Sequence, residues 1–256
     1  MPKLSLVIPA YNEEKRLGRT LNDYGSYFLN KLGEDYEIFV VLNGCRDRTL
    51  DVVKGYSKKY PAIRYIDIKE GIGKGGALIE GFKIVNGDYI GFVDADGATN
   101  ASAYYNLYEQ IKDYDGIIAS RWIKGAKVRV RQTAGRRIAS RLFNVLVRIL
   151  FGIDIVDSQC GAKLFTKKAI KNVVNELGTT RWAFDIDLLY LLKRNGFKLT
   201  EVPTEWDDQA ESQLKMHRVI PEMLLAIIRL RLVYSPFSFV VDAYNKIWEM
   251  LKSLIK

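Results

Sequence analysis

The sequence has few of the residues that define several common protein classes. Its 256 residues include only two cysteines, one histidine and six prolines. Cys45 and Cys160 lie far apart and do not make the framework of a small disulfide-rich secreted domain, so a reducing compartment is the simpler interpretation. The lone histidine, His217, excludes a metal site that depends on several imidazole ligands.

Long apolar runs are also missing. Arg141 and Arg148 interrupt one apolar stretch, and Arg229 and Arg231 interrupt another, well short of the roughly 20 apolar residues that a membrane span needs. The N-terminal apolar run is too short for a signal-peptide core and ends at Pro9. We therefore expect a soluble protein or one bound peripherally to a membrane.

Acidic residues are absent from Gly116 to Ile153, although this segment contains nine Lys and Arg residues. The whole chain carries a formal net charge of +9, so this basic segment accounts for the entire excess. Such a segment is either a surface that binds an anionic partner or a solvated face. The 48% of hydrophobic residues excludes a disordered chain, because it allows a sizeable core.

Strand-like and helix-like patterns alternate over the first 120 residues. Short runs rich in β-branched and aromatic residues predict strands at Leu4–Ile8, Tyr36–Leu42, Ile63–Ile68, Tyr89–Val93 and Gly116–Ala119. Helical spacing predicts helices at Glu13–Leu32, Thr49–Tyr60, Ala77–Val85 and Ala101–Lys112. This alternation indicates an α/β fold with a mostly parallel central sheet and helices on both faces.

The remainder of the chain has a different pattern. A helix over 135–151 has a wide apolar face beside a stripe of cations, which favours contact with a membrane surface. Another helix begins near Phe184, a strand covers Lys198–Val202, and amphipathic helices cover Ile220–Leu232 and Phe237–Ile255. For the last of these, core or oligomer packing is favoured over membrane anchoring.

Two carboxylates, Asp94 and Asp96, follow the apolar run Tyr89–Val93 directly. Two carboxylates one residue apart on a strand-ending turn can hold a hard divalent cation that also binds diphosphate oxygens. Turn and capping roles are an equally good explanation for this pair alone.

A glycine-rich segment, Gly71–Gly76, lies between a strand and a helix and contains Lys74. It fits the dinucleotide-binding pattern G-x-G-x-x-G, but it belongs to the third strand–helix unit, and no Ser or Thr follows Lys74 as in a Walker A loop. The simplest interpretation is a helix N-terminus that binds phosphate, and a plain turn is the alternative. Together with Asp94 and Asp96, it favours a nucleotide-sugar site.

Several motifs resemble one enzyme family. They are Val7–Glu13, Asn43–Thr49, Gly73–Ala77, Asp94–Thr99, Asp157–Phe165 and Arg181–Leu189. The chain is similar over about 4–206 to the inverting family 2 glycosyltransferases of GT-A fold, and most similar to dolichyl-phosphate glucosyltransferases and related mannose-phosphate synthases. The resemblance implies a GT-A domain over 1–210, with a nucleotide-sugar half at 1–120 and an acceptor half at 121–210, and a helical extension at 211–256.

The resemblance also implies roles for particular residues. Asp94 and Asp96 would hold Mg²⁺ or Mn²⁺, and Asp157 and Asp185 would lie on the sugar side, where either could be a general base. The residues implied in donor binding are Pro9, Tyr11, Glu13, Asn43, Asp47, Lys74 and Asp94. Because a lipid monophosphate is mostly dianionic at neutral pH, it needs a cationic clamp more than a base, and we expect Arg121 and Arg131 to supply it.

The substrates remain open in part. Ala98 stands where mannose-phosphate synthases tend to carry Gln, which favours UDP-glucose over GDP-mannose as donor, while Asn43 replaces a common Asp and leaves the nucleobase open. The expected acceptor is a polyprenyl or dolichyl phosphate, used by a peripheral enzyme on the cytoplasmic face of an anionic membrane. The alternatives are a mannose or N-acetylhexosamine donor, or a soluble glycan acceptor. A nucleic-acid-binding protein is a remote alternative, because it leaves Asp94 and Asp96 unexplained.

Overall fold

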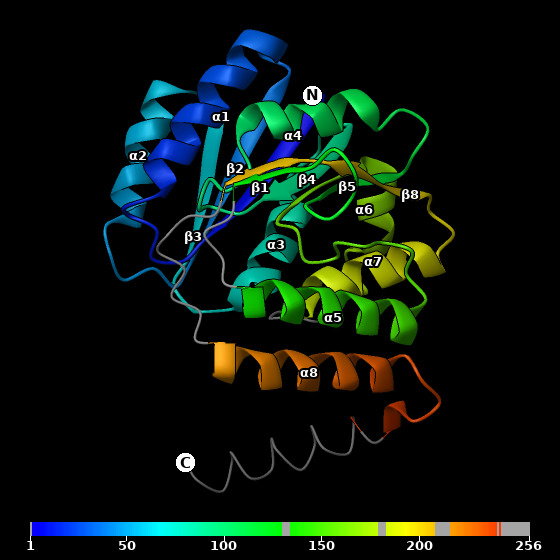
Figure 1. The fold of residues 1–256 in the computed structure, drawn as a ribbon. Helices are drawn as coiled ribbons and strands as arrows, with labels where there is room; N and C mark the ends of the chain where they lie inside the picture. The colour runs from blue at the N-terminus through cyan, green and yellow to red at the C-terminus, as the bar shows by residue number, and fades with distance from the viewer. Residues whose placement is uncertain (1, 130–133, 179–182, 208–215, 240, 242–256) are drawn as a thin grey trace, which may run out of the picture.

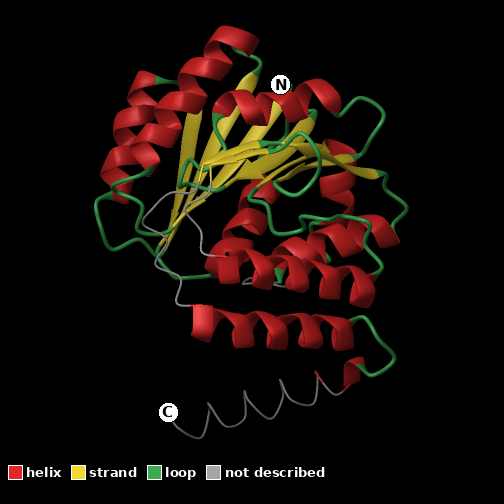
Figure 2. Ribbon diagram, viewed as in Figure 1, coloured by secondary structure: helices red, strands yellow, loops and turns green. Residues whose placement is uncertain are grey.

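A seven-stranded sheet forms the centre of the molecule (Figures 1 and 2). The computed structural model describes residues 2–129, 134–178, 183–207, 216–239 and 241. The strands lie in the order β3-β2-β1-β4-β7-β5-β8. Their bounds are β1 Leu4–Ala10, β2 Tyr36–Asn43, β3 Ile63–Ile68, β4 Tyr89–Val93, β5 Gly116–Ser120, β7 Ala162–Thr166 and β8 Leu199–Pro203.

Helices cover both faces of this sheet (Figure 1). One face carries α1 (Leu17–Leu32), α2 (Thr49–Lys59) and α4 (Ala101–Gln110). The other carries α3 (Gly73–Ile84), α6 (Lys167–Val173) and α7 (Phe184–Arg194). Beyond them lie α5 (Ala134–Phe151) and then α8 (Met216–Val233), side by side at the bottom of the view. The predicted α/β class with a mostly parallel sheet is confirmed.

An apolar core lies on each face of the sheet, which explains why the central strands are continuous hydrophobic runs in the sequence. Every residue of β2 is buried, and alternate residues of β1 and β2 point into the core on either face. A strand with helices on both sides has no solvent-facing side, so it shows no alternation of polar and apolar residues. Buried apolar surface of this kind is the main stabilising contribution to the fold.

One strand departs from the simple alternation that the sequence indicated. β7 lies between β4 and β5 and runs antiparallel to both, so these two successive strands are not neighbours. All but its last residue fall within a segment noted for its motif, and its five residues are too few for periodicity to separate strand from loop. The parallel pairs continue on its far side, where β8 pairs with β5.

Two helix starts also differ from the expected ones. α1 begins at Leu17 instead of Glu13, and α3 begins at Gly73 instead of Ala77. The glycines of the expected turn therefore form the first turn of α3, and Gly73 itself has a positive φ of 78°. This places Lys74 on the helix instead of on a loop before it.

Short elements that the sequence did not indicate complete the described structure. β6 (Lys127–Arg129) and β9 (Glu205–Asp207) form a separate two-stranded sheet. No helix among the described residues has the length and apolar character to traverse a bilayer. Most of the helix expected at Phe237–Ile255 falls outside the described residues.

Candidate functional site

The polar residues singled out in the sequence gather at the carboxyl edge of the parallel strands. β1 pairs with β2 so that Ala10 faces Leu42, and β1 pairs with β4 so that Val7 faces Phe92. The turns after β1, β2 and β4 therefore meet at one end of the sheet. Ligand sites in open α/β sheets lie at this edge, beyond the carboxyl ends of the strands.

Lys74 links two parts of this edge. Its Nζ lies 2.6 Å from Asp94 Oδ1 and 3.9 Å from Asp185 Oδ2. The side chains of Lys74 and Asp94 are 36% and 38% exposed, so this pair faces solvent in part. Burial lowers the pKa of Lys74, but the charges of Asp94 and Asp185 outweigh it and hold this pKa above its usual value. The ammonium therefore stays charged.

Two hydrogen bonds hold the tight turn that carries Asp94 and Asp96. Thr20 on α1 donates its hydroxyl to the Ala95 carbonyl, and the Ala98 N–H donates to Asp96 Oδ1. Burial, followed by the charge of Asp94, raises the pKa of Asp96. A Cβ on Gly161 would overlap the Asp94 carboxylate, so this glycine makes room for it.

The donor atoms of Asp94 and Asp96 suit a hard divalent cation. Both offer carboxylate oxygens, which Mg²⁺ and Mn²⁺ prefer, and Asp94 already pairs with the positive charge of Lys74. The described residues contain no group of three or more His, Cys, Asp and Glu side chains placed to hold a metal. Two carboxylates would leave most coordination positions to water and phosphate oxygens, as is usual for Mg²⁺.

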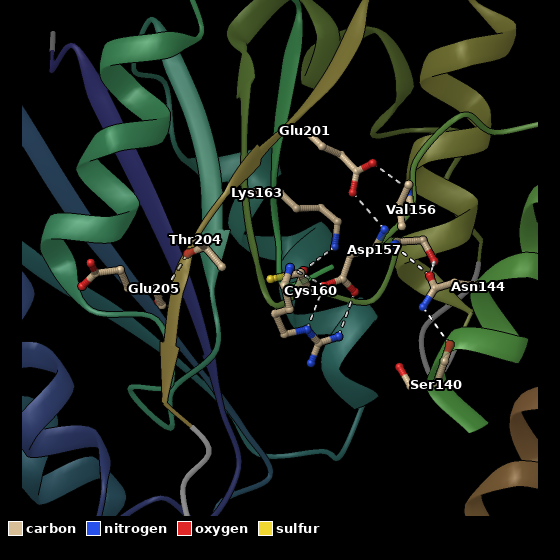
Figure 3. Close-up of polar contacts among 11 residues, drawn as sticks. Ser140, Asn144, Val156, Asp157, Cys160, Lys163, Glu201, Thr204 and Glu205 are labelled. Atoms are coloured by element: carbon tan, nitrogen blue, oxygen red, sulfur yellow. Dashed lines mark hydrogen bonds and ion pairs between the residues drawn. The ribbon is translucent and has the colours of Figure 1, made fainter. Parts of the chain in front are cut away.

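Lys163 is a charged residue of this site that sequence reasoning missed. It is fully buried on β7 and donates to Asp185 Oδ1. It also donates at 2.6 Å to the Cys160 carbonyl (Figure 3). Burial raises the pKa of Asp185, but the charges of Lys163 and Lys74 outweigh it and lower this pKa. A lysine within the apolar run Ala162–Phe165 was the available signal, because a buried lysine needs a partner of opposite charge.

Arg121 and Asp157 form a second, more deeply buried pair. Arg121 Nε and Nη2 each donate at 2.8 Å to the Asp157 carboxylate, and the Arg121 backbone N–H also donates to it. The Asp157 side chain is fully buried and that of Arg121 is 14% exposed. Burial lowers the pKa of Arg121, but the Asp157 charge outweighs it, so the guanidinium stays charged. Both carboxylate oxygens of Asp157 are occupied, which is a poor arrangement for a general base.

The loop that carries Asp157 is anchored from two sides (Figure 3). The Glu201 carboxylate on β8 accepts the backbone N–H groups of Val156 and Asp157. On the other side, Asn144 of α5 accepts both the backbone N–H and the hydroxyl of Ser158. The position of the Arg121–Asp157 pair thus depends on α5 as well as on the sheet.

The predicted donor-binding residues lie around the first two turns. Asn43 Oδ1 accepts the Ile72 N–H at 2.7 Å, which joins the end of β2 to the start of α3. Gly44 permits this contact, because it has a positive φ of 67° and a Cβ there would lie 3.0 Å from the Gly71 backbone. The Asp47 carboxylate accepts the N–H groups of Glu14 and Thr49. Asn43 and Asp47 therefore also shape the turns.

The turn after β1 presents one exposed aromatic ring. Pro9 lies in β1, and Tyr11 beyond it is 57% exposed. The Glu13 carboxylate accepts two hydrogen bonds from the Arg16 guanidinium. Tyr11 is thus available for contact with a ligand, while Glu13 is engaged in an ion pair.

The cations of the basic segment Gly116–Ile153 have different surroundings in the structure. Arg121 is bound to Asp157, Lys127 pairs at the surface with Glu205, and Arg141 lies over the Trp122 ring at 5.0 Å from its centroid. Arg137 and Arg148 are exposed on α5. Arg131, the second residue of the expected phosphate clamp, lies outside the described residues.

The two cysteines do not suit nucleophilic chemistry. Cys160 is fully buried, and burial raises the pKa of its thiol to about 12. The Cys45 thiol donates to the Ala10 carbonyl. Both therefore fit a role as small packing residues, since the thiolate is the reactive form.

Comparison with known proteins agrees with this architecture. Residues 5–174 match the model of the family described as "Glycosyl transferase family 2". A dolichyl-phosphate beta-glucosyltransferase of Trichomonas vaginalis is 34% identical over 85% of this chain and 69% of its own length. One of Drosophila melanogaster is 36% identical over 83% of this chain and 69% of its own.

A solved structure shows the same fold at lower sequence identity. It is a mannosyltransferase from Pyrobaculum calidifontis in complex with GDP-Man and Mn²⁺, with a TM-score of 0.62 and 15% identity. The match covers 90% of this chain and 60% of that protein, so the chain spans less than two thirds of its length. Because the family model covers about two thirds of the sequence and the curated relatives most of it, the chain belongs to glycosyl transferase family 2 and is a glycosyltransferase.

Proposed function

We propose that this protein transfers a hexose from a nucleotide sugar to a polyprenyl or dolichyl phosphate at a membrane surface, with inversion at the anomeric carbon. UDP-glucose is the favoured donor, and GDP-mannose is the alternative. The observation that carries the proposal is the position of Asp94, a partly exposed carboxylate at the carboxyl edge of the sheet that is paired with the Lys74 ammonium. The names of the curated relatives support the acceptor and the sugar.

Asp94 and Asp96 are the residues proposed to hold Mg²⁺ or Mn²⁺. Bound there with the donor diphosphate, such a cation would supply positive charge to the leaving group. Lys74 lies beside Asp94 and would add a second positive charge to the same region. Pro9, Tyr11, Glu13, Asn43 and Asp47 are proposed to line the nucleotide side.

The proposed acceptor needs little help from a base. A phosphate monoester has its second pKa near ~6, so at neutral pH an oxygen of the dianion can attack the anomeric carbon as the bond to the diphosphate breaks. The ion pairs of Asp157 with Arg121 and of Asp185 with Lys163 fit this mechanism, because both carboxylates are engaged. We propose that Asp157 positions Arg121 on the acceptor side. Arg121 and Arg131 are the residues proposed to clamp the acceptor phosphate.

Helix α5 presents the surface that we propose binds an anionic lipid bilayer. Four apolar residues on one side of it are exposed, with Ile149 reaching 74%. They recur at helical spacing as Ile138, Leu142, Val145 and Ile149. The exposed Arg137, Arg141 and Arg148 lie along the same helix and complement anionic headgroups. An enzyme placed on the cytoplasmic face of a membrane would then meet its lipid acceptor beside Arg141, Trp122 and Arg121.

One assay tests the proposal. The protein is incubated with polyprenyl phosphate and a panel of labelled UDP- and GDP-sugars, with Mg²⁺ or with EDTA, and the lipid is extracted. We expect label from UDP-glucose to enter the organic phase only with Mg²⁺ present. Label that never enters this phase would contradict the lipid acceptor, and transfer that persists in EDTA would contradict the metal.

A further inference from the structure

Lys74 occupies a position between two carboxylates of different character. Its Nζ is 2.6 Å from Asp94 Oδ1 and 3.9 Å from Asp185 Oδ2, and it lies 5.5 Å from the centroid of the Phe92 ring. Asp94 is the partly exposed member of the proposed metal pair, whereas the Asp185 side chain is only 7% exposed. One ammonium thus connects a solvent-facing carboxylate to a buried one.

The buried carboxylate is fixed in place. Lys163 donates to Asp185 Oδ1, and Lys163 is itself held by the Cys160 carbonyl and lies 5.1 Å from the centroid of the Phe92 ring. The second Asp185 oxygen is the one that faces Lys74. Asp185 therefore offers Lys74 a stationary negative charge that does not depend on Asp94.

Lys74 has the freedom to use either partner. It stands in the first turn of α3, where its neighbours along the chain are Gly73, Gly75 and Gly76, and no side chain of theirs crowds it. A lysine ammonium is a point charge on a flexible four-carbon stem, so a displacement of an ångström or two requires no backbone change.

We propose that Lys74 and a divalent cation compete for Asp94, and that Asp185 retains Lys74 at the site when the cation takes its place. The physical reason is that two positive charges cannot both lie within contact distance of one carboxylate without strong mutual repulsion. In the ligand-free enzyme, Lys74 offsets the charges of Asp94 and Asp185. The inference rests on the proposed function for the identity of the metal site.

The competition has a consequence for the order in which ligands act. A metal ion alone must displace Lys74, but a metal ion that arrives with a diphosphate brings an anion that the displaced ammonium can face. Metal and nucleotide should therefore strengthen each other's binding, and thermodynamic linkage requires that the effect be reciprocal. The enzyme would hold a metal weakly until a nucleotide is present.

The test is a titration of Mn²⁺ with and without UDP, with free Mn²⁺ measured by electron paramagnetic resonance. Lys74→Met removes the competing charge, and Lys83→Met is the matched control, because Lys83 lies on the same helix and pairs with Glu80 at the surface. We expect Lys74→Met to bind Mn²⁺ alone roughly tenfold more tightly than wild type, the size that a partly exposed charge pair supports. We expect UDP to enhance Mn²⁺ binding less in Lys74→Met than in wild type, and Lys83→Met to behave as wild type.

The possible outcomes separate this inference from the proposed function. Unchanged or weaker Mn²⁺ binding by Lys74→Met, with UDP still enhancing binding as in wild type, would overturn the competition and leave the metal site intact. Mn²⁺ binding by no variant, even with UDP, would remove the metal from the proposed function and the inference with it. Circular dichroism of each variant confirms that the fold is retained.

Discussion

Two cation–carboxylate pairs lie near the same edge of the sheet and differ in burial. Lys74 and Asp94 are each more than a third exposed, while Asp157 is fully buried and Arg121 nearly so. Lys74 contacts Asp94 through one ammonium, whereas Arg121 grips Asp157 through two guanidinium nitrogens and its backbone N–H.

Because the two pairs differ in burial, they suit different roles. A partly exposed ion pair contributes little to stability, so its members can exchange partners at low cost. A buried pair contributes little net stability as a whole, but removing one partner leaves an uncompensated buried charge. The Lys74–Asp94 pair is therefore suited to ligand exchange and the Arg121–Asp157 pair to holding a fixed geometry.

Arg121→Met is the substitution from which we expect the largest effect. It leaves the Asp157 carboxylate buried without its guanidinium, and we expect the free energy of unfolding to fall by about 3–5 kcal/mol. Urea denaturation measures the change. Lys74→Met is the matched substitution in the exposed pair, and it should change stability by less than about 1 kcal/mol. Equal losses in the two variants would contradict the distinction.

Asp94→Asn tests the same comparison through activity. We expect at least a roughly 100-fold loss in transfer rate, about 2.7 kcal/mol, because the proposed metal loses a charged ligand. Stability should change by less than about 1 kcal/mol, since the side chain is 38% exposed. Asp35→Asn, which removes the carboxylate of the exposed Lys3–Asp35 pair, is the control and should leave the rate unchanged. A rate close to wild type in Asp94→Asn would contradict the assigned role.

Leu142→Asn tests the proposed lipid-binding surface on α5, where an exposed side chain should matter for binding and not for stability. Leu142 is exposed on α5, so removing its side chain should leave the free energy of unfolding nearly unchanged. If α5 lies on a bilayer, flotation with anionic vesicles should fall about tenfold, because a buried leucine contributes roughly 1.5–3 kcal/mol. Leu29→Asn on α1 replaces another exposed leucine and serves as the control. Equal flotation of both variants would argue against α5 as the lipid-binding surface.

The smallest expected effect concerns Asp47, a hydrogen-bonded carboxylate on the proposed nucleotide side. Partial burial raises the pKa of Asp47, but hydrogen bonds from Thr49 and the Glu14 N–H outweigh it and lower this pKa. The stabilising contribution of Asp47 is therefore present above its ordinary pKa of about 3.9 and is lost as the pH falls through the lower native value. Asp47→Asn should cost about 1 kcal/mol at pH 7 and progressively less as the pH falls below the ordinary pKa of Asp, as thermal unfolding at a series of pH values would show. A loss independent of pH would contradict this origin.

Much of the fold was predictable because local pattern and burial agree there. The first four strands fall where apolar β-rich runs indicated them, since a buried parallel strand needs such a run. β7 was not predicted, because nothing in five residues reveals that they insert antiparallel between β4 and β5. The start of α3 was misplaced because glycines usually mark turns, whereas here Gly73 begins the helix.

The sequence predicted which residues belong to the candidate site better than which of them form ion pairs with one another. Asp94, Asp157, Asp185 and Lys74 were singled out from motifs, and Arg121 from the acid-free basic segment. The sequence did not show that Arg121 is already bound to Asp157, because the two lie 36 residues apart and meet only through the packing of β5 against the loop before β7. A lysine in an apolar run signals a buried ion pair, but the sequence does not show that the partner of Lys163 is Asp185, 22 residues away.

The amino-acid sequence by itself determined the α/β class, the family and the residues that carry charge at the carboxyl edge, because these depend on local patterns and motifs. Only the tertiary structure decided which charge meets which, since partners distant in the chain are brought together by strand order and helix packing. It also decided their burial, which makes Lys74–Asp94 an exchangeable pair and Arg121–Asp157 a fixed one.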